Sequence, residues 1–96
     1  MLFALICTDK PESVELRMKV RPDHLAFLEG LGSAMKGAGP FTDDAGNPTG
    51  SLILVEAENR SAAETLAARD PYAKAGLFSS VEIRPWKWVI NNPEAK

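Results

Sequence analysis

The sequence of 96 residues predicts an α+β fold, in which one antiparallel sheet carries helices on one of its faces. Three observations favour this class. Two apolar runs have the length of buried strands, helical stretches follow each of the two runs, and a third strand-like region lies near the C-terminus. A chain of this length is expected to form one domain, spanning residues 1–96, with a modest core.

The first strand is expected over residues 1–7, which are apolar at every position and therefore suit a central strand covered on both faces. A helical stretch is expected to open at Pro11 and Ser13. A second, longer helix is expected over residues 22–36, because proline is favoured in the first turn of a helix. One face of this helix carries a stripe with helical spacing: His24, Phe27, Leu28, Leu31 and Met35.

The middle of the chain contains the second apolar run. Residues 39–41 are expected to form a short strand, residues 42–50 a turn-rich loop, and residues 51–57 a second central strand. The next helix is predicted to begin with a capping box formed by Ser61 and Glu64.

Pro71 is expected to stop that helix, which then ends at about Asp70. The last strand region is expected over residues 78–90. Its apolar alternation changes phase at Pro85, which predicts a bulge or a strand that moves to a new partner.

The resulting order, strand–helix–strand–strand–helix–strand, is the ferredoxin-like βαββαβ pattern. Helices cover only one face of such a sheet, whereas the two central strands are apolar on both. We therefore expect a homodimer formed through the sheet faces. Trp86 and Trp88, which the change of phase aims in a new direction, are expected to contribute to this interface, so that truncation after Arg84 weakens it.

Composition excludes several classes of function. Lys and Arg number 11 and Asp and Glu 13, so the net charge of −2 offers no basic surface for nucleic acid. One cysteine and one histidine exclude an internal disulfide and a typical zinc site. No segment has the pattern of a signal peptide or a membrane span, and we expect a cytoplasmic protein without a cofactor.

The topology predicts that His24 and Asp70 meet at one edge of the sheet, where Ser51 also lies. The N-terminus of a helix disfavours imidazolium, and the C-terminus of a helix disfavours carboxylate. An aspartate that accepts the N–H of the imidazole fixes the tautomer and stabilises the imidazolium formed on proton abstraction. The pair is therefore a candidate for general acid–base catalysis, and the alternative is a histidine that a carboxylate satisfies in the core.

Four other residues are weaker candidates for substrate binding. For Arg17 and Arg21 there are two interpretations: they attract an anionic substrate, or they lie on a solvated face of the helix. The solvated face is favoured. Tyr72 lines a pocket or packs after the helix. Ser51 starts a strand and lacks an activating group unless His24 reaches it.

The chain resembles the YciI-like (YCII-related) family over nearly its whole length. The resemblance rests on the apolar first strand and five motifs: Arg21-Pro22-x-His24-Leu25, Ala38-Gly39-Pro40, Thr49-Gly50-Ser51, Asp70-Pro71-Tyr72-x-x-Ala75-Gly76-Leu77 and Arg84-Pro85-Trp86. It implies a dimeric α/β barrel with a His–Asp active site on His24 and Asp70. One relative is a dehydrochlorinase of hydroxylated aromatics, and similar barrels include muconolactone isomerases and cofactor-independent monooxygenases.

We therefore expect a small cofactor-independent enzyme of the isomerase, lyase or dehydrochlorinase type, in which His24 and Asp70 act on an aromatic or lactone-like molecule. The alternative is a non-catalytic module of the same fold that binds a small ligand or a partner. A third hypothesis, taken from related barrels, places His24 as the axial ligand of a haem.

Overall fold

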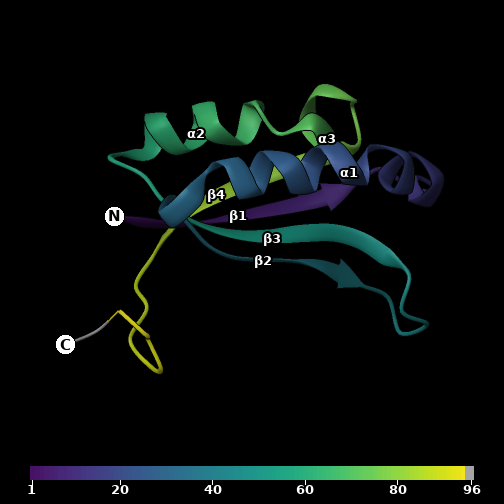
Figure 1. The fold of residues 1–96 in the computed structure, drawn as a ribbon. Coiled ribbons are helices and arrows are strands. Elements are labelled where there is room, and N and C mark those ends of the chain that lie inside the picture. Colours follow the sequence, from purple (N-terminus) through teal and green to yellow (C-terminus); the bar gives the residue numbers. More distant parts are fainter. Residues whose placement is uncertain (95–96) are drawn as a thin grey trace.

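The computed structural model describes residues 1–94 and has the predicted ferredoxin-like α+β architecture (Figure 1). The antiparallel sheet has the order β2-β3-β1-β4, with the strands β1 (Leu2–Asp9), β2 (Met35–Thr42), β3 (Pro48–Glu56) and β4 (Phe78–Trp86). One face carries the helices α1 (Val14–Gly30), α2 (Arg60–Ala68) and α3 (Pro71–Lys74), and a short 3-10 helix (Gly32–Ala34) precedes β2.

The core lies between the sheet and the helices. β1 and β3 are the central strands, and alternate residues of both point at the helices because side chains alternate between the two faces of a strand. The buried core cluster is Phe3, Leu5, Cys7, Leu28, Ile53, Val55, Ala63 and Ala67. No helix of residues 1–94 is both long and apolar enough to cross a membrane.

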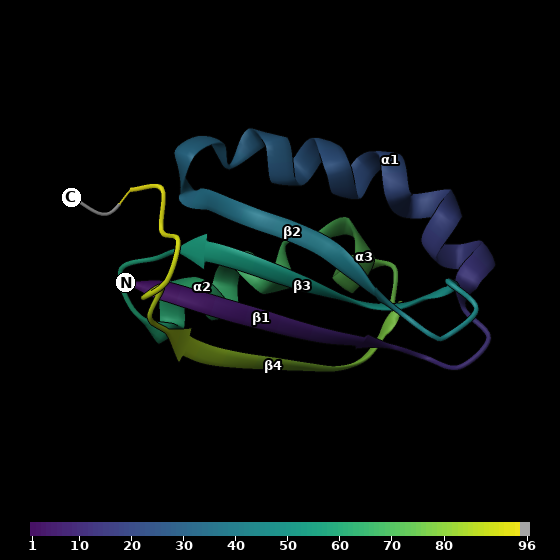
Figure 2. The same ribbon diagram turned by 90° about the horizontal axis from the view of Figure 1, so that it is seen from below.

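The predicted boundary at Pro22 is wrong. α1 is one helix that begins at Val14, continues through Pro22 and ends at Gly30. Proline inside a helix removes one backbone hydrogen bond and bends the axis, and Figure 2 shows α1 bent in its first half. Gly32, in the left-handed region at φ 60°, separates α1 from the 3-10 helix, and Met35 begins β2 instead of belonging to the helix.

The predicted capping box of the second helix is also wrong. α2 begins at Arg60, and its N-cap is Asn59, whose side-chain oxygen accepts the N–H of Ala62 at 2.9 Å. Ser61 and Glu64 therefore lie inside the helix. Asn59 takes the cap because its extended backbone precedes the first helical residue, which is the conformation that an N-cap needs.

β4 shows no bulge at Pro85. Its register with β1 is regular up to the pairs of Pro85 with Phe3 and Trp86 with Leu2, and the irregularity lies at the other end, between Thr8 and Asp9. β4 is an edge strand, where proline is tolerated because one row of backbone groups has no strand partner. The strand ends at Trp86, and the change of apolar phase marks its exit from the sheet.

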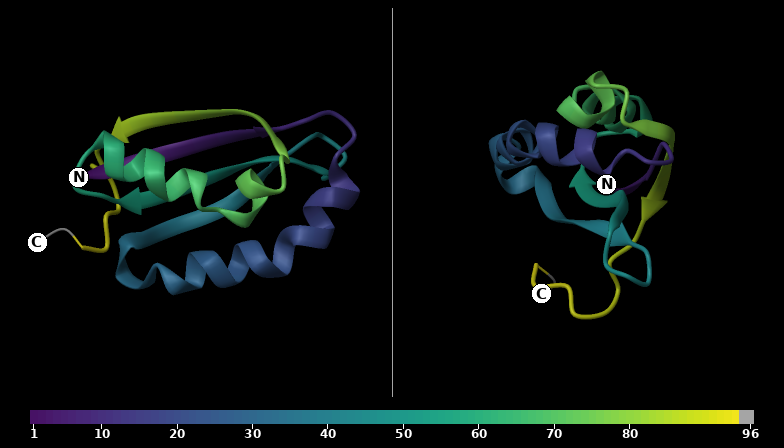
Figure 3. Two further views of the ribbon diagram at one scale, coloured as in Figure 1. Left: turned by 90° about the horizontal axis from the view of Figure 1, so that it is seen from above. Right: turned by 90° about the vertical axis from the view of Figure 1, so that its right-hand side faces the viewer.

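The sheet face that points away from the helices is called the open face here. Its central residues are the apolar side chains of Leu2, Ala4, Ile6, Leu52 and Leu54. Figures 1 and 3 show the segment after β4 projecting on this side of the sheet. The ion pair of Glu94 with Lys36, at 2.7 Å, ties this segment to β2, the opposite edge strand.

Gly50 is expected to be the glycine least tolerant of substitution. A Cβ added there would lie 2.2 Å from the backbone oxygen of Cys7, so the two central strands would have to separate. We expect Gly50→Ala to lower the free energy of unfolding by at least ~3 kcal/mol in urea titrations. The control is Gly30→Ala, at a site with no atom within 4 Å of the added Cβ. Equal stability of the two variants would contradict this expectation.

Candidate active site

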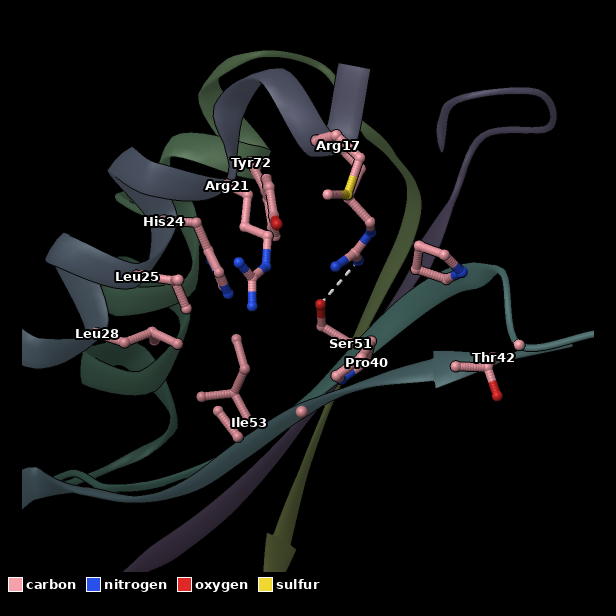
Figure 4. Close-up of a pocket in the computed structure, with 15 residues that line it drawn as sticks. Arg17, Arg21, His24, Leu25, Leu28, Pro40, Thr42, Ser51, Ile53 and Tyr72 are labelled. Carbon is pink, nitrogen blue, oxygen red and sulfur yellow. Dashed lines mark hydrogen bonds between the residues drawn. The ribbon is translucent and has the colours of Figure 1, made fainter. Parts of the chain in front are cut away.

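A cavity of about 250 Å³ opens between α1, α3 and the β2–β3 half of the sheet (Figure 4). Its lining includes five of the six residues singled out in the sequence: Arg17, Arg21, His24, Ser51 and Tyr72. The rest of the lining is mostly apolar and comes from α1, β2 and β3, among them Leu28, Pro40 and Ile53. The sixth residue, Asp70, lies behind His24.

His24 and Asp70 form the predicted pair. Nδ1 of His24 lies 2.8 Å and 3.0 Å from the two carboxylate oxygens of Asp70, and the two residues are only 6% and 2% exposed. Nε2 of His24 has no hydrogen-bond partner within residues 1–94. Every fully buried side-chain nitrogen or oxygen of these residues has a partner, so Nε2 is not fully buried. Nε2 is therefore open to the cavity that His24 lines.

The electrostatic reasons predicted for this pair are wrong. His24 lies in the middle of α1, away from the charge of the helix N-terminus. Asp70 does not end α2. It is the N-cap of α3, where its Oδ1 accepts the N–H of Tyr72 at 2.9 Å. The carboxylate of Asp70 therefore has two hydrogen-bond partners, the N–H of Tyr72 and Nδ1 of His24.

Tyr72 connects the two sides of the site. Its ring stacks on the ring of His24 at 3.9 Å between centroids, and the guanidinium carbon of Arg17 lies 4.5 Å from the centroid of Tyr72. In Figure 4 the ring stands between His24 and Arg17. Both hypotheses for Tyr72 are therefore met, because it is 1% exposed and also lines the cavity.

Tyr72 is expected to ionise only above the usual pH. Burial raises the pKa of Tyr72, and the charges of Arg17 and Arg21 oppose this effect. A tyrosine with a raised pKa stabilises the fold fully below its unfolded pKa of ~10, and this stabilisation is lost as the pH rises through the folded pKa. Because the chain has a single tyrosine, its near-ultraviolet titration reports this residue alone.

The control for this titration is Arg21→Gln, which removes one opposing charge and should raise the pKa of Tyr72 further. A native midpoint at or below that of the urea-unfolded chain would contradict the expectation.

The sequence favoured a solvated face of the helix for Arg17 and only a strand start for Ser51. In the structure the two residues are joined by a hydrogen bond beside the cavity. The side chain of Arg17 donates from Nε and Nη2 to the carboxylate of Asp9, at 2.7 Å and 3.0 Å, and Nη2 also donates to Ser51 Oγ at 2.8 Å. Burial acts to lower the pKa of Arg17, but the hydrogen bond and charge of Asp9 raise it on balance. The side chains of Arg17 and Asp9 are each 5% exposed.

Asp9 is the residue that the sequence analysis missed. Its neighbours Thr8 and Lys10 are polar, so the segment has the composition of a turn, and no motif marks its carboxylate as buried. For Arg17 a signal exists. It precedes His24 by seven residues, or two helical turns, which places both on the same face of a continuous helix.

The remaining polar groups differ in their surroundings. Arg21 lines the cavity, and its guanidinium forms no ion pair within residues 1–94. Cys7 lies beneath the site, where burial raises the pKa of its thiol to about 12, which keeps it protonated and unreactive as expected. Residues 1–94 contain no group of three or more His, Cys, Asp or Glu that could hold a metal ion.

Comparison with known proteins gives the chain its family. A YCII-related domain matches residues 1–87. Protein YciI of Escherichia coli O6:H1 is 38% identical over 94% of this chain and its own full length, and an uncharacterized protein of Haemophilus influenzae is 37% identical over the same shares.

Among solved structures, 5-chloro-2-hydroxyhydroquinone dehydrochlorinase (TftG) of Burkholderia phenoliruptrix, in complex with 2,5-dihydroxybenzoquinone, is 34% identical. The match covers 91% of this chain and 94% of that one, with a TM-score of 0.83. SnoaB, a cofactor-independent oxygenase of Streptomyces nogalater, shares the fold at 9% identity and a TM-score of 0.56, covering 95% and 96% of the two chains. The chain belongs to the family of proteins with a YCII-related domain.

Proposed function

We propose that the protein is a small cofactor-independent enzyme in which His24, oriented by Asp70, transfers a proton to or from a single-ring substrate. One observation carries the proposal. Nδ1 of His24 is held by both oxygens of Asp70, while Nε2 is open to a cavity. A histidine that served only the core would have both of its nitrogens engaged or shielded.

The chemistry follows from the hydrogen bonds of the pair. The carboxylate of Asp70 accepts a hydrogen bond from Nδ1–H, which leaves the lone pair of the neutral imidazole on Nε2. Nε2 can then remove a proton from a substrate carbon or hydroxyl, and Asp70 stabilises the imidazolium that results. The same group returns the proton to a leaving group or to another carbon of the ring.

The substrate class follows from the cavity. A volume of about 250 Å³ lies below the ~300–1,000 Å³ of pockets for drug-sized ligands, which suits a single ring. The cationic Arg21 at its side favours an anionic ring substituent. The dehydrochlorinase TftG, similar in sequence and fold, binds 2,5-dihydroxybenzoquinone, and this compound is our probe of the cavity.

The test has two parts. Binding of 2,5-dihydroxybenzoquinone is followed by its visible absorption, and turnover is screened with hydroxylated and chlorinated hydroquinones and with small lactones. Binding together with turnover supports the enzyme. Binding without turnover of any class would favour the non-catalytic binding module.

We also propose that the protein is a homodimer in which two open faces pack together. The open face has apolar side chains in its centre, and Phe41 and Trp86 next to it are about 40% exposed. Apolar surface of this kind on a small domain is a common site of association. The segment after β4 adds Val89 and Ile90, which are 70% and 73% exposed.

Removal of residues 88–96 is expected to weaken the dimer. A cut after Arg84 would also remove the partners of Phe3 and Leu2 in β1, whereas a cut after Lys87 leaves β4 whole. Sedimentation at micromolar concentration should show a dimer for the full chain and a larger dissociation constant for the shortened one. A stable monomer of the full chain, or an unchanged dissociation constant, would contradict one of these two expectations.

A further inference from the structure

A chain of three buried polar side chains ends at the cavity. Asp9 at the end of β1 binds Arg17 of α1 through two hydrogen bonds, and Arg17 donates a third, of 2.8 Å, to Ser51 Oγ on β3. Ser51 is 2% exposed and lines the cavity. Figure 4 shows the hydroxyl of Ser51 pointing at the guanidinium of Arg17, with the hydrogen bond between them dashed.

The hydrogen-bond inventory fixes the role of the serine hydroxyl. Arginine has donors only, so Ser51 Oγ must be the acceptor in its bond with Arg17. The proton of the hydroxyl is then free to be donated elsewhere, and it forms no hydrogen bond to an acceptor in residues 1–94. His24 does not bond to Ser51 either, so no base in the structure activates this serine as a nucleophile.

The arginine that directs this hydroxyl is held from several sides. The carboxylate of Asp9 binds two of its nitrogens, and the ring of Tyr72 lies against its guanidinium. A buried ion pair adds little to stability on average, because removing both charges from water offsets their attraction. Since Asp9 neutralises Arg17, the pair fixes a geometry without leaving a free charge on the arginine.

We propose that Ser51 donates a hydrogen bond to a negatively charged oxygen of the substrate, and that Asp9 and Arg17 are positioning residues that aim its hydroxyl. The inference rests on the proposed function. It adds the group that binds the negative charge left on the substrate when His24 removes a proton. His24 takes the proton on Nε2, the electron pair moves onto the ring oxygen, and the Ser51 hydroxyl stabilises that oxygen while keeping its own proton. A donor fixed in advance at a developing oxyanion is an effective means of transition-state stabilisation.

Two ligands with the same quinone ring, only one of which can ionise, separate this role from simple packing. 2,5-Dihydroxybenzoquinone ionises readily because its charge is spread over the quinone, whereas 2,5-dimethoxybenzoquinone keeps the ring and cannot ionise. We expect Ser51→Ala to weaken binding of the ionised compound by ~10-fold or more, as is typical of a lost hydrogen bond to a charged group, and to leave the dimethyl ether nearly unaffected. Ser51→Thr, which keeps a hydroxyl, should retain the binding.

The positioning role is tested by a double-mutant cycle. Arg17→Lys removes the forked guanidinium that contacts both Asp9 and Ser51, so it should weaken binding of the ionised ligand. Adding Ser51→Ala to this variant should reduce the affinity only slightly further. The pKa of the bound dihydroxyquinone, followed by its absorption, should rise in Ser51→Ala and in Arg17→Lys. A residue that only supported the fold would change the melting temperature without this spectral shift.

Three outcomes would overturn the proposal: wild-type protein that binds the ionised compound no more tightly than the ether, equal losses for both ligands in Ser51→Ala, or additive effects in the cycle. None of these measurements depends on turnover. If the binding tests contradict the role of Ser51, the acid–base role of His24 is still decided by the activity measurements. If the activity measurements contradict the role of His24, the binding results for Ser51 still hold.

Discussion

His24→Gln is expected to lower kcat by ~10²–10⁴-fold on any ring compound that the wild-type protein converts, because it removes the group that carries the proton. Glutamine is the sharpest replacement. Its amide can still donate to Asp70, so the buried carboxylate keeps a partner, whereas alanine would leave it unpaired at a cost of ~1–3 kcal/mol. The lost stacking on Tyr72 should lower stability by only ~0.5–1.5 kcal/mol.

The opposite pattern would identify a structural histidine. If turnover in His24→Gln stayed near that of wild type while the melting temperature fell sharply, His24 would belong to the core and the enzyme proposal would be dropped. Kinetics and thermal melts on the same preparations therefore decide the question together.

Asp70→Asn is expected to reduce kcat by a comparable or larger factor with little loss of structure. Asparagine can still accept the N–H of Tyr72, so α3 keeps its cap. Its amide can donate to Nδ1 of His24, however, and the proton of the imidazole then moves to Nε2. Nε2 would become a donor towards the cavity and could no longer remove a proton, an error of tautomer that can cost ~10⁴-fold.

A matched variant separates capping from catalysis. Asn59 caps α2 with a hydrogen bond of 2.9 Å, the same length as that of Asp70 in α3, but only Asp70 also binds His24. Asn59→Ala and Asp70→Ala should both lose the ~0.5–2 kcal/mol of a cap. Asp70→Ala should lose a further ~1–3 kcal/mol because Nδ1 of His24 is left unpaired, and only Asp70→Ala should lose activity. Equal activity of the two variants would show that Asp70 serves the helix alone.

The meeting of His24 and Asp70 could be predicted from the sequence although the helix boundaries were wrong. The order of strands and helices determines which segments lie side by side, and this order does not depend on whether a helix begins at Val14 or Pro22. The boundaries depend on weaker local preferences. A proline at a permitted first-turn position and one inside a bent helix look the same in sequence.

The bonds of Arg17 could not be derived in this way. A charged residue on a short helix is on average solvated, and only the position of Asp9 in three dimensions makes its burial favourable. Strand alternation puts Asp9 on the same face of β1 as Cys7, but no sequence pattern shows that Arg17 lies opposite its carboxylate. Long-range polar contacts of this kind are set by tertiary structure.

The shared oxygen of Asp70 has a consequence for dynamics. Oδ1 accepts both the N–H of Tyr72, which starts the four-residue α3, and the Nδ1 proton of His24. Fraying of this single helical turn would release the carboxylate and let the imidazole rotate, long before the sheet opens. We therefore expect local opening of α3, rather than global unfolding, to set the thermal limit of this base.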